Sequence, residues 1–468
     1  MKTKDQSTLD QFQSEHQTVN ERIAAGKELR KKYPRIQHGD YKPVADRADP
    51  VSILEEQAKS RLQELVPVRY ARMLASPFAF LRGGAAIMAA DLTANGENAG
   101  INVQACGDMH VANFGVFASA ERNLVFGIND FDETLPGPWE WDMKRLATSI
   151  VVSARFLRAD KDLCAASVYA AVRSYRKRMK QYAFMGHLEL WYSTINENDI
   201  LNSLSPSARK GAEKIVGKAR QRSHMQVLSK LTDLVDDKFC LRENAPFIVR
   251  ETHTQAGRSI EEALGLLLES YFLSLADDRK KLLQQYRIVD VARKVVGVGS
   301  VGTRCWVIFL LGNHSNDPLF LQVKEAQPSV FEPFSEKSIV TNQGRRVVEG
   351  QRLIQGAPDI FLGWGEQDGI HFYLRQLRDW KGGIEFDPKA IKIKNYPQYC
   401  SLCGWALALA HAKSGDPAMI SGYIGNSDEL DKAMLKFALA YSNQNEKDYK
   451  VFQTAAKSGR IKVAAVKE

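Results

Sequence analysis

The chain has few cysteines and lacks any apolar stretch long enough to cross a membrane. A transmembrane helix needs about 20 mostly apolar residues, and the N-terminal MKTKDQSTLDQFQSEHQ also lacks the apolar centre of a secretion signal. Of the 6 cysteines, only Cys400 and Cys403 form a CxxC pair, with no histidine at zinc spacing. We therefore expect no metal knuckle, no disulfide framework, no membrane association, and a reducing, cytoplasmic location.

A strong excess of one charge is absent as well. The 468 residues include 64 Lys plus Arg and 55 Asp plus Glu, which gives a net charge of +9. Basic residues do not cluster with aromatic ones, so we do not expect nucleic acid as a partner. Apolar residues at 44% and charged residues at 25% are typical of a globular protein. At about 150 residues per domain, the length favours two or three domains.

The pattern of helices and strands divides the chain into four parts. Residues 1–50 are polar and predict a loose N-terminal arm with one helix. Residues 51–286 begin with helices and two short strands, and the stretch 160–285 is almost all helical by pattern. Residues 287–380 are rich in strands, and residues 381–468 are mainly helical. Two separate blocks of strands among helices predict an α+β fold with two lobes.

Two acidic motifs each follow a short predicted strand. GDMHVAN places Asp108 and Asn113 five residues apart, and NDFDE after the next strand supplies Asp130 and Asp132. Phosphoryl transfer from a nucleotide needs a carboxylate for the acceptor hydroxyl and hard oxygen ligands for Mg²⁺. The two motifs together offer that set. The alternative is that they are polar turn residues, with the acidic ones exposed to solvent.

A glycine-rich segment lies further along the chain. GVGSVG at 297–302 is followed by TRCWVIFLLG, which predicts a strand. A Rossmann fingerprint with the same glycine spacing would open a helix instead. The next strand ends at Lys324, where a lysine can reach nucleotide phosphates. The alternative for Lys324 is an ordinary surface lysine.

Three further carboxylates need an assignment. Glu349 lies on a predicted helix after Lys324, where a kinase places the carboxylate that holds its lysine. Glu325 competes for that role, although it points to the other face of its strand. Asp142, at the start of a predicted buried helix, can accept hydrogen bonds from backbone amides of the Asp108 loop or simply cap its own helix.

These motifs together resemble the protein-kinase-like superfamily, most closely its aminoglycoside and choline phosphotransferase branch. GDMHVAN and INDFDE match the catalytic loop and metal strand of that branch in order and spacing. The longer runs SPFAFLRGGAA, NDFDETLPGPWEWDMKRLA, LQVKEA and LRQLRDWKGG resemble a bacterial family known as domain of unknown function 2252, from about Val51 to Gly459.

The motif order differs from that of an ordinary kinase. The glycine segment and Lys324 come after Asp108 here, and LCGWALALAHAKSGD resembles the helix that normally leads into the catalytic loop. The resemblance therefore implies a circularly permuted, two-lobed kinase-like fold. Its large lobe would be mostly helical, its smaller nucleotide lobe would be an antiparallel sheet, and the C-terminal helices would pack back on the large lobe. It also places Lys324 within a phosphate's length of Asp130, and the helix of His411 near Asp108.

The resemblance also implies individual roles. Asp108 would be the base or would orient the acceptor hydroxyl, while Asn113 and Asp130 would hold Mg²⁺, with Asp132 as a further ligand or a turn cap. Arg82 would contact substrate or phosphate, or form a structural ion pair. The nucleotide contacts would be Gly297, Gly299, Ser300, Gly302, Lys324 held by Glu349, and a hinge of Gln376, Leu377 and Arg378. His110 and His411 are assigned to structure, because the chemistry needs neither.

The function implied is an ATP- and Mg²⁺-dependent phosphotransferase acting on an unidentified hydroxyl acceptor, either a small molecule or a protein. A nucleotidyl transferase that moves AMP would use the same residues with ATP bound in reverse. A nucleotide-binding regulator without catalysis is the third hypothesis, although such a protein is free to lose Asp108, Asn113, Asp130 and Lys324.

Overall fold

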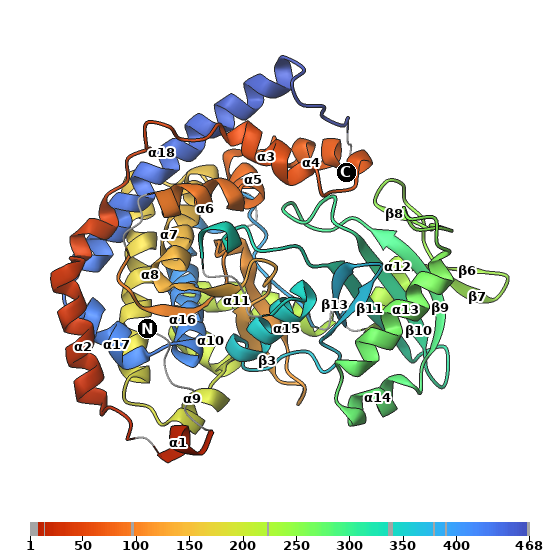
Figure 1. The fold of residues 1–468 in the computed structure, drawn as a ribbon, viewed down its shortest axis with the longest axis horizontal. Helices are drawn as coiled ribbons and strands as arrows, with labels where there is room; N and C mark the ends of the chain where they lie inside the picture. The colour runs from red at the N-terminus through yellow and green to blue at the C-terminus, as the bar shows by residue number, and fades with distance from the viewer. Residues whose placement is uncertain are drawn as a thin grey trace.

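The protein is α+β, as predicted, and is mostly helical with several small antiparallel sheets. Figure 1 shows most of the helices on one side and the largest sheet, in green and cyan, on the other. Among the described residues, no helix combines the length and apolar character that a membrane crossing requires. The computed structural model describes residues 8–13, 15–94, 98–221, 224–335, 340–377, 380–388 and 391–465.

Three long helices form the centre of the helical part: α7 (Trp139–Phe156), α8 (Lys161–Tyr182) and α16 (Tyr396–Ser414). Most of α7 is buried, because α8, α16 and α18 (Glu429–Lys457) pack around it. The backbones of α8 and α16 come close at Gly404, where an added Cβ would lie 2.0 Å from the carbonyl oxygen of Ala171. This packing matters for function, because α7 and α16 both carry residues that support the site described below.

The first 50 residues are packed more closely than predicted. Helix α2 (Val19–Lys32) lies against α17 (Pro417–Ile424), and a Cβ at Gly26 would lie 2.0 Å from the carbonyl oxygen of Met419. Arg30 donates hydrogen bonds to carbonyl groups at the C-terminal end of α17, where the helix dipole favours a cation. The prediction of a loose arm was wrong for α2, because this helix packs on α17.

Four helices follow along the chain and lead to the segment that contains the acidic motifs. They follow one another closely, and Pro77 after the capping residue Ser76 begins the third. Their bounds are α3 (Pro50–Ala58), α4 (Val66–Met73), α5 (Pro77–Gly83) and α6 (Ala85–Ala94).

Two small sheets follow. β1 (Asn102–Ala105) pairs with β4 (Leu135–Pro138), while β3 (Leu124–Ile128) pairs with both β2 (Phe114–Ala118) and the short β5 (Ile195–Asn196). The two acidic motifs, GDMHVAN and NDFDE, occupy connections between these strands. The small sheets therefore fix where the acidic residues lie.

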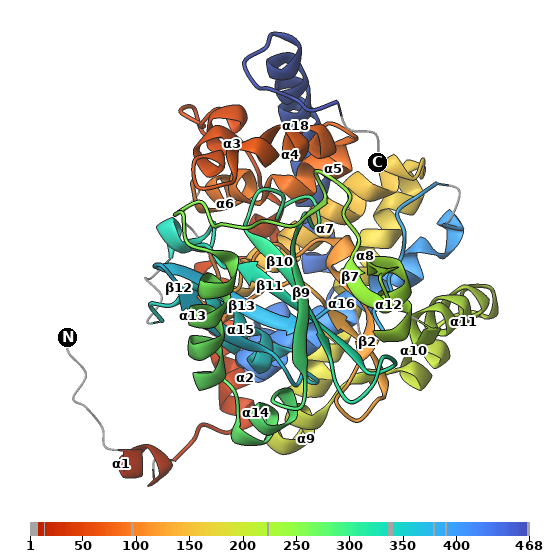
Figure 2. The ribbon, with the colours of Figure 1, turned by 90° about the vertical axis from the view of Figure 1, so that its right-hand side faces the viewer.

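The largest sheet has six antiparallel strands in the order β12-β13-β11-β10-β9-β8 (Figure 2). Its strands are β8 (Ile248–Val249), β9 (Arg287–Lys294), β10 (Cys305–Leu311), β11 (Pro318–Glu325), β12 (Gly363–Gln367) and β13 (Ile370–Gln376).

The two faces of this sheet differ in chemistry. One face is apolar and packs on α13 (Ile260–Leu273), for example through Leu321 and Leu374. Every second side chain of β11 and β13 points to the other face, which therefore carries Gln322, Lys324, Tyr373 and Arg375. These polar groups meet the acidic residues that follow β3.

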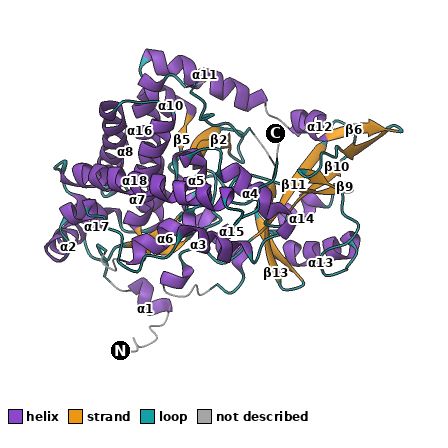
Figure 3. Ribbon diagram, turned by 90° about the horizontal axis from the view of Figure 1, so that it is seen from above, coloured by secondary structure: helices purple, strands orange, loops and turns teal. Residues whose placement is uncertain are grey.

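The predicted helical stretch 160–285 needs correction. It contains three short strands between residues 232 and 249, and α12 (His224–Leu231) and α13 pack on the large sheet instead of the helical part (Figure 3). Apolar side chains of α13 need a partner surface, and the sheet supplies it. The remaining elements are α1 (Thr8–Gln13), α9 (His187–Tyr192), α10 (Glu197–Ser203), α11 (Pro206–Gln221), α12 (His224–Leu231), β6 (Thr232–Val235), β7 (Lys238–Leu241), α14 (Asp277–Leu283) and α15 (Gln343–Ile354).

Candidate functional site

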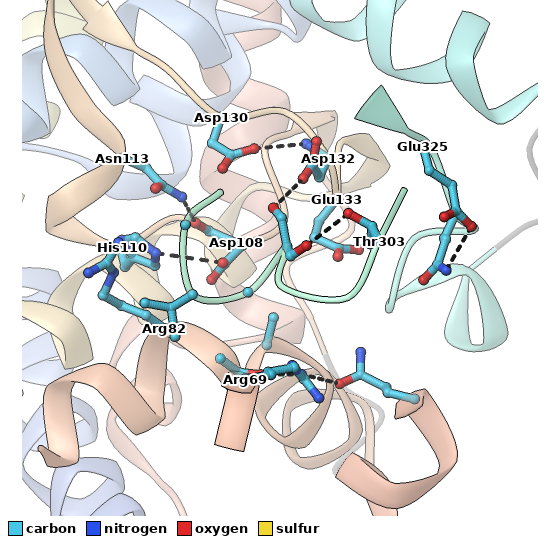
Figure 4. Close-up of a pocket in the computed structure, with 18 of the residues that line it drawn as sticks. Arg69, Arg82, Asp108, His110, Asn113, Asp130, Asp132, Glu133, Thr303 and Glu325 are labelled. Atoms are coloured by element: carbon cyan, nitrogen blue, oxygen red, sulfur yellow. Dashed lines mark hydrogen bonds and ion pairs between the residues drawn. The ribbon is translucent and has the colours of Figure 1, made fainter. Parts of the chain in front are cut away.

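A solvent-open cleft lies where the helices α3 to α5, the loop after β1 and the large sheet meet (Figure 4). It encloses about 860 Å³ of empty space, part of it open solvent. Residues from segments far apart in the sequence line it. Those predicted from the sequence are Arg82, Asp108, Asn113, Asp130, Asp132, Gly297, Gly299 and Ser300.

The loop after β1, residues 106–113, is held by a carboxylate from α7. Asp142 accepts hydrogen bonds from the amides of Cys106, at 2.6 Å, and Gly107, at 2.9 Å, which confirms the role predicted for it. His411 on α16 lies 3.1 Å from the same carboxylate and contacts Tyr175 through its other ring nitrogen. Gly107 has a φ of 82°, and a Cβ there would lie 2.4 Å from the carbonyl oxygen of Glu133. Only glycine fits this position.

Asp108 forms an ion pair that the sequence did not suggest. Arg145 of α7 donates to its Oδ1 from Nη2, at 2.6 Å, and from Nε, at 2.9 Å. Nε2 of His110 lies 3.6 Å from the other oxygen, Oδ2. Burial raises the pKa of Asp108, and Arg145 counteracts that effect. Oδ2 is thus the oxygen left for a ligand in the cleft.

Asn113 and Asp130 both present oxygen atoms. The amide nitrogen of Asn113 donates to the carbonyl oxygen of Asp108 at 2.7 Å, which leaves the amide oxygen for other contacts. Asp130 makes no ion pair among the described residues and accepts only the amide of Asp132, at 3.3 Å. Burial and the charge of Asp132 raise the pKa of Asp130, while Lys324 opposes them.

The carboxylate of Asp132 accepts hydrogen bonds from residues of the large sheet. Its Oδ2 accepts hydrogen bonds from Lys324 and from Ser300, the latter at 3.2 Å, and its Oδ1 accepts the hydroxyl of Tyr373 at 2.7 Å. Burial alone would raise the pKa of Asp132, but Lys324 and Tyr373 lower it overall. The side chain predicted as a further metal ligand is therefore the partner of the lysine.

Glu349 does not hold Lys324, contrary to the prediction. Its carboxylate accepts a hydrogen bond from Arg345, 2.6 Å away, and its side chain is 42% exposed, whereas that of Lys324 is 4% exposed. The buried face of α15 instead presents Arg346, which donates to the carbonyl oxygens of Asp132 and Thr134. Helix α15 thus fixes the backbone of the acidic segment, residues 129–133.

The glycine loop, residues 297–302, closes the cleft on one side. Arg72 donates to the carbonyl oxygen of Gly297 at 2.6 Å, and the amide of Leu62 donates to that of Gly302 at 2.8 Å. The φ angles of Gly297 (65°) and Gly302 (90°) are left-handed, which favours glycine at both positions. Gly302 is absent from the residues that line the cleft.

The predicted hinge lies away from this cleft. The amide of Gln376 donates to Asp359 and that of Leu377 to the carbonyl oxygen of Phe320, at 2.8 Å, so both amides are used. Gln376 lines a separate pocket. Arg378 lies outside the described residues.

Several residues of the cleft were not predicted from the sequence. Arg61 and Arg69 line it from the helical side, and burial raises the pKa of Glu133, a further lining residue, to about 7. Arginines on helices usually lie in solvent, so the pattern alone does not single them out. The sequence feature that could have predicted a cationic partner in the cleft is the acidic segment, residues 129–133. Among the described residues, no cluster of three or more His, Cys, Asp or Glu side chains could hold a metal ion alone.

Residues 61–455 match the family described as "Uncharacterized protein conserved in bacteria (DUF2252)", and the chain belongs to that family. No curated protein matches the chain. No solved structure matches it either.

Proposed function

We propose that the protein is an ATP- and Mg²⁺-dependent phosphotransferase that acts on a hydroxyl acceptor, on a circularly permuted protein-kinase-like fold. The observation that carries the proposal is the convergence of Asp108, Asn113 and Asp130 in one cleft, beside Lys324 and under the glycine loop. The acidic residues lie at positions 108–130, and the glycine loop and Lys324 lie at positions 297–324, so segments far apart in the sequence meet in the cleft. Turn residues without a function would not need to meet.

The arrangement of the large sheet supports the fold part of the proposal. The glycine loop connects the neighbouring strands β9 and β10, Lys324 is the penultimate residue of the next strand β11, and α15 follows. A kinase nucleotide lobe uses that sequence of parts. Contacts of α16 with β1, and of His411 with Asp142, fit a helix that leads into the catalytic loop despite its late position in the chain.

The oxygen donors fit Mg²⁺. This ion takes oxygen ligands in octahedral geometry, commonly one or two carboxylates together with phosphate oxygens and water. Asp130 and the amide oxygen of Asn113 would hold it. The lack of a metal-holding cluster of three or more His, Cys, Asp or Glu side chains among the described residues is consistent with a metal that arrives with the donor's phosphates. The bound ion would neutralise charge on those phosphates.

Asp108 would orient the acceptor hydroxyl and receive its proton at Oδ2. Arg145 fixes the carboxylate through Oδ1 and opposes the rise in its pKa that burial causes. Phosphoryl transfer depends mainly on positioning and charge stabilisation, so a carboxylate fixed in this way suits it. Lys324 would exchange part of its contact with Asp132 for phosphate oxygens.

One observation favours the second candidate, nucleotidyl transfer. The amides of Gln376 and Leu377 are bonded within the protein, so two donors expected to face a nucleotide base are used. ATP bound in the reverse orientation would not need them. The same cleft residues would then act on the α-phosphate.

The test compares thermal stability with and without Mg-ATP in the wild type, Asp130→Asn and Glu349→Gln. The last is a matched carboxylate-to-amide control on the exposed face of α15. A ligand at 100 times its dissociation constant adds about 2.7 kcal/mol of stability. We expect a Mg²⁺-dependent shift in the wild type and the control, and none in Asp130→Asn.

Label from γ-labelled ATP, but not from α-labelled ATP, should then reach an acceptor or the protein itself. Transfer of the α-label would establish the nucleotidyl alternative. A wild-type protein that shows no Mg²⁺-dependent shift at millimolar ATP would contradict both enzymatic functions.

A further inference from the structure

Three arginines line the cleft without a carboxylate partner. Arg61 lies in the turn after α3, Arg69 on α4 and Arg82 on α5, and none forms an ion pair with a described residue. Three of the carboxylates that line the cleft have other cations: Asp108 pairs with Arg145, Asp132 with Lys324, and Glu325 with Arg304. The other two, Asp130 and Glu133, form no ion pair with a described residue. The three arginines thus line the same cleft as the acidic residues, and Figure 4 shows Arg69 and Arg82 below Asp108 and Glu133.

Their hydrogen bonds are incomplete as well. Arg69 is 1% exposed and donates from Nη2 to the carbonyl oxygen of Gly83, at 2.9 Å, and to Gln57, at 3.1 Å, but its Nε and Nη1 have no partner. Arg61 donates only from Nη1, to the carbonyl oxygen of Val301 at 2.6 Å, and its buried Nε is unpaired. Arg82 makes no hydrogen bond with a described residue, and its guanidinium lies 5.9 Å from the ring centre of Phe78.

Two other arginines with largely covered side chains do pair with carboxylates. Arg47 contacts both Asp91 and Asp448 at 2.6 Å, and Arg176 contacts Asp431 at 2.9 Å. A buried charge without a counterion costs several kcal/mol. Burial lowers the pKa of Arg61, Arg69 and Arg82, which reflects that cost, yet arginine stays protonated in proteins. An anionic ligand would remove the penalty.

We propose that Arg61, Arg69 and Arg82 form a subsite for a phosphate-type oxyanion, adjacent to Asp108. Guanidinium groups present planar pairs of donors that match phosphate oxygens, and three of them suit a dianion. Anion binding itself does not depend on the proposed function. Under that function, the anion is either the terminal phosphate of the donor or an anionic group of the acceptor, which would then be a phosphorylated or similarly charged hydroxyl compound.

The first test measures binding of inorganic phosphate by calorimetry, without Mg²⁺, to the wild type and to Arg82→Gln. Arg82 makes no hydrogen bond in the fold, so this variant should keep its structure. Loss of one charged hydrogen-bonding group should weaken phosphate binding by about ten- to a hundredfold. Arg345→Gln, which has the same charge change on the exposed face of α15, should bind phosphate like the wild type.

Arg69→Lys supplies a second variant, because it keeps the charge but loses the planar donor pair. It should also bind phosphate more weakly than the wild type. The proposal is overturned if both variants bind phosphate as tightly as the wild type. It is equally overturned if the wild type shows no saturable binding at millimolar phosphate.

A second measurement assigns the source of the anion. Phosphate binding is repeated with a saturating, non-hydrolysable ATP analogue and Mg²⁺. Competition assigns the subsite to the donor's terminal phosphate, and unchanged binding assigns it to the acceptor. If the proposed function fails, the analogue produces no Mg²⁺-dependent thermal shift, while phosphate binding and its loss in Arg82→Gln persist and still support the subsite.

Discussion

Arg145 and Asp108 form a buried ion pair in which two guanidinium nitrogens, Nη2 at 2.6 Å and Nε at 2.9 Å, contact one carboxylate oxygen. Nη2 also donates to the carbonyl oxygen of Leu81 at 2.6 Å. One side chain of α7 therefore connects the loop after β1 to α5. The position of Asp108 in the cleft depends on this contact as much as on its own loop.

Replacing Arg145 with Met should destabilise the protein. The Asp108 carboxylate would lose its cation inside the protein, which raises its pKa further and costs about 3–5 kcal/mol. The double variant Arg145→Met with Asp108→Asn should recover part of the loss, because no unpaired charge remains. Urea unfolding of the four proteins in this cycle measures the coupling, and strictly additive changes would contradict a direct interaction.

The partner of Lys324 can be tested by two matched substitutions. Asp132→Asn removes the carboxylate that Lys324 contacts and should cost about 3 kcal/mol or more of unfolding free energy. Glu349→Gln removes only an exposed contact with Arg345 and should change it by less than about 0.5 kcal/mol. Denaturation in urea compares the two. Equal losses would mean that Glu349 holds the lysine after all.

Stability should fall on mild acidification because of buried histidines. Burial, together with the nearby Lys144, lowers the pKa of His38 well below its ordinary value, and its Nδ1 has no partner. The unfolded chain then binds the proton more readily than the folded one. The contribution of His38 to stability is therefore complete above about pH 6.5, and the free energy of unfolding drops by about 1.4 kcal/mol for each pH unit below it. His110, buried beside Arg82 and Arg145, adds a similar loss.

His38→Gln separates the two contributions. Chemical denaturation between about pH 7 and pH 5 should show a smaller pH slope in this variant than in the wild type. The hydrogen bond of His38 with Tyr423, 2.7 Å in length, is also lost, so the variant is less stable at neutral pH. An unchanged slope would show that His38 does not titrate differently on folding.

Two glycines in helices should respond in opposite directions to alanine. At Gly404 of α16, a Cβ would lie 2.0 Å from the carbonyl oxygen of Ala171, so Gly404→Ala should separate α16 from α8 and cost about 1–3 kcal/mol. At Gly265 of α13, nothing lies within 4 Å of an added Cβ, and Gly265→Ala should stabilise the helix by up to about 1 kcal/mol. Thermal unfolding measures both. A Gly404→Ala protein as stable as the wild type would mean that the two helices can separate at little cost.

The sequence was most informative where a feature is local. Short strands bounded by turns placed Asp108, Asn113 and Asp130 at strand ends, and the cleft contains all three. For Asp142 the sequence left two roles open, hydrogen bonds to the Asp108 loop or a cap of its own helix, and the structure shows the first.

Prediction failed where a helix had to be assigned a buried face. Three of the four charges of GRRVVEGQRLIQG, those of Arg345, Glu349 and Arg352, recur every three or four residues and share one face of α15, and the fourth, that of Arg346, lies off this face. Neighbouring positions on a helix differ by about 100°. Packing against Thr134, where Gly350 allows close approach, turns Arg346 toward the acidic segment and leaves Glu349 outside.

The sequence by itself determined the α+β class, the acidic turns and the glycine loop, because each depends on residues within a few positions of one another. Tertiary structure alone decided which cation meets which carboxylate: Arg145 pairs with Asp108 and Lys324 with Asp132. Arg61, Arg69 and Arg82 pair with no carboxylate among the described residues. Charges far apart in the chain interact strongly only after burial removes the water between them, and burial is a property of the whole fold.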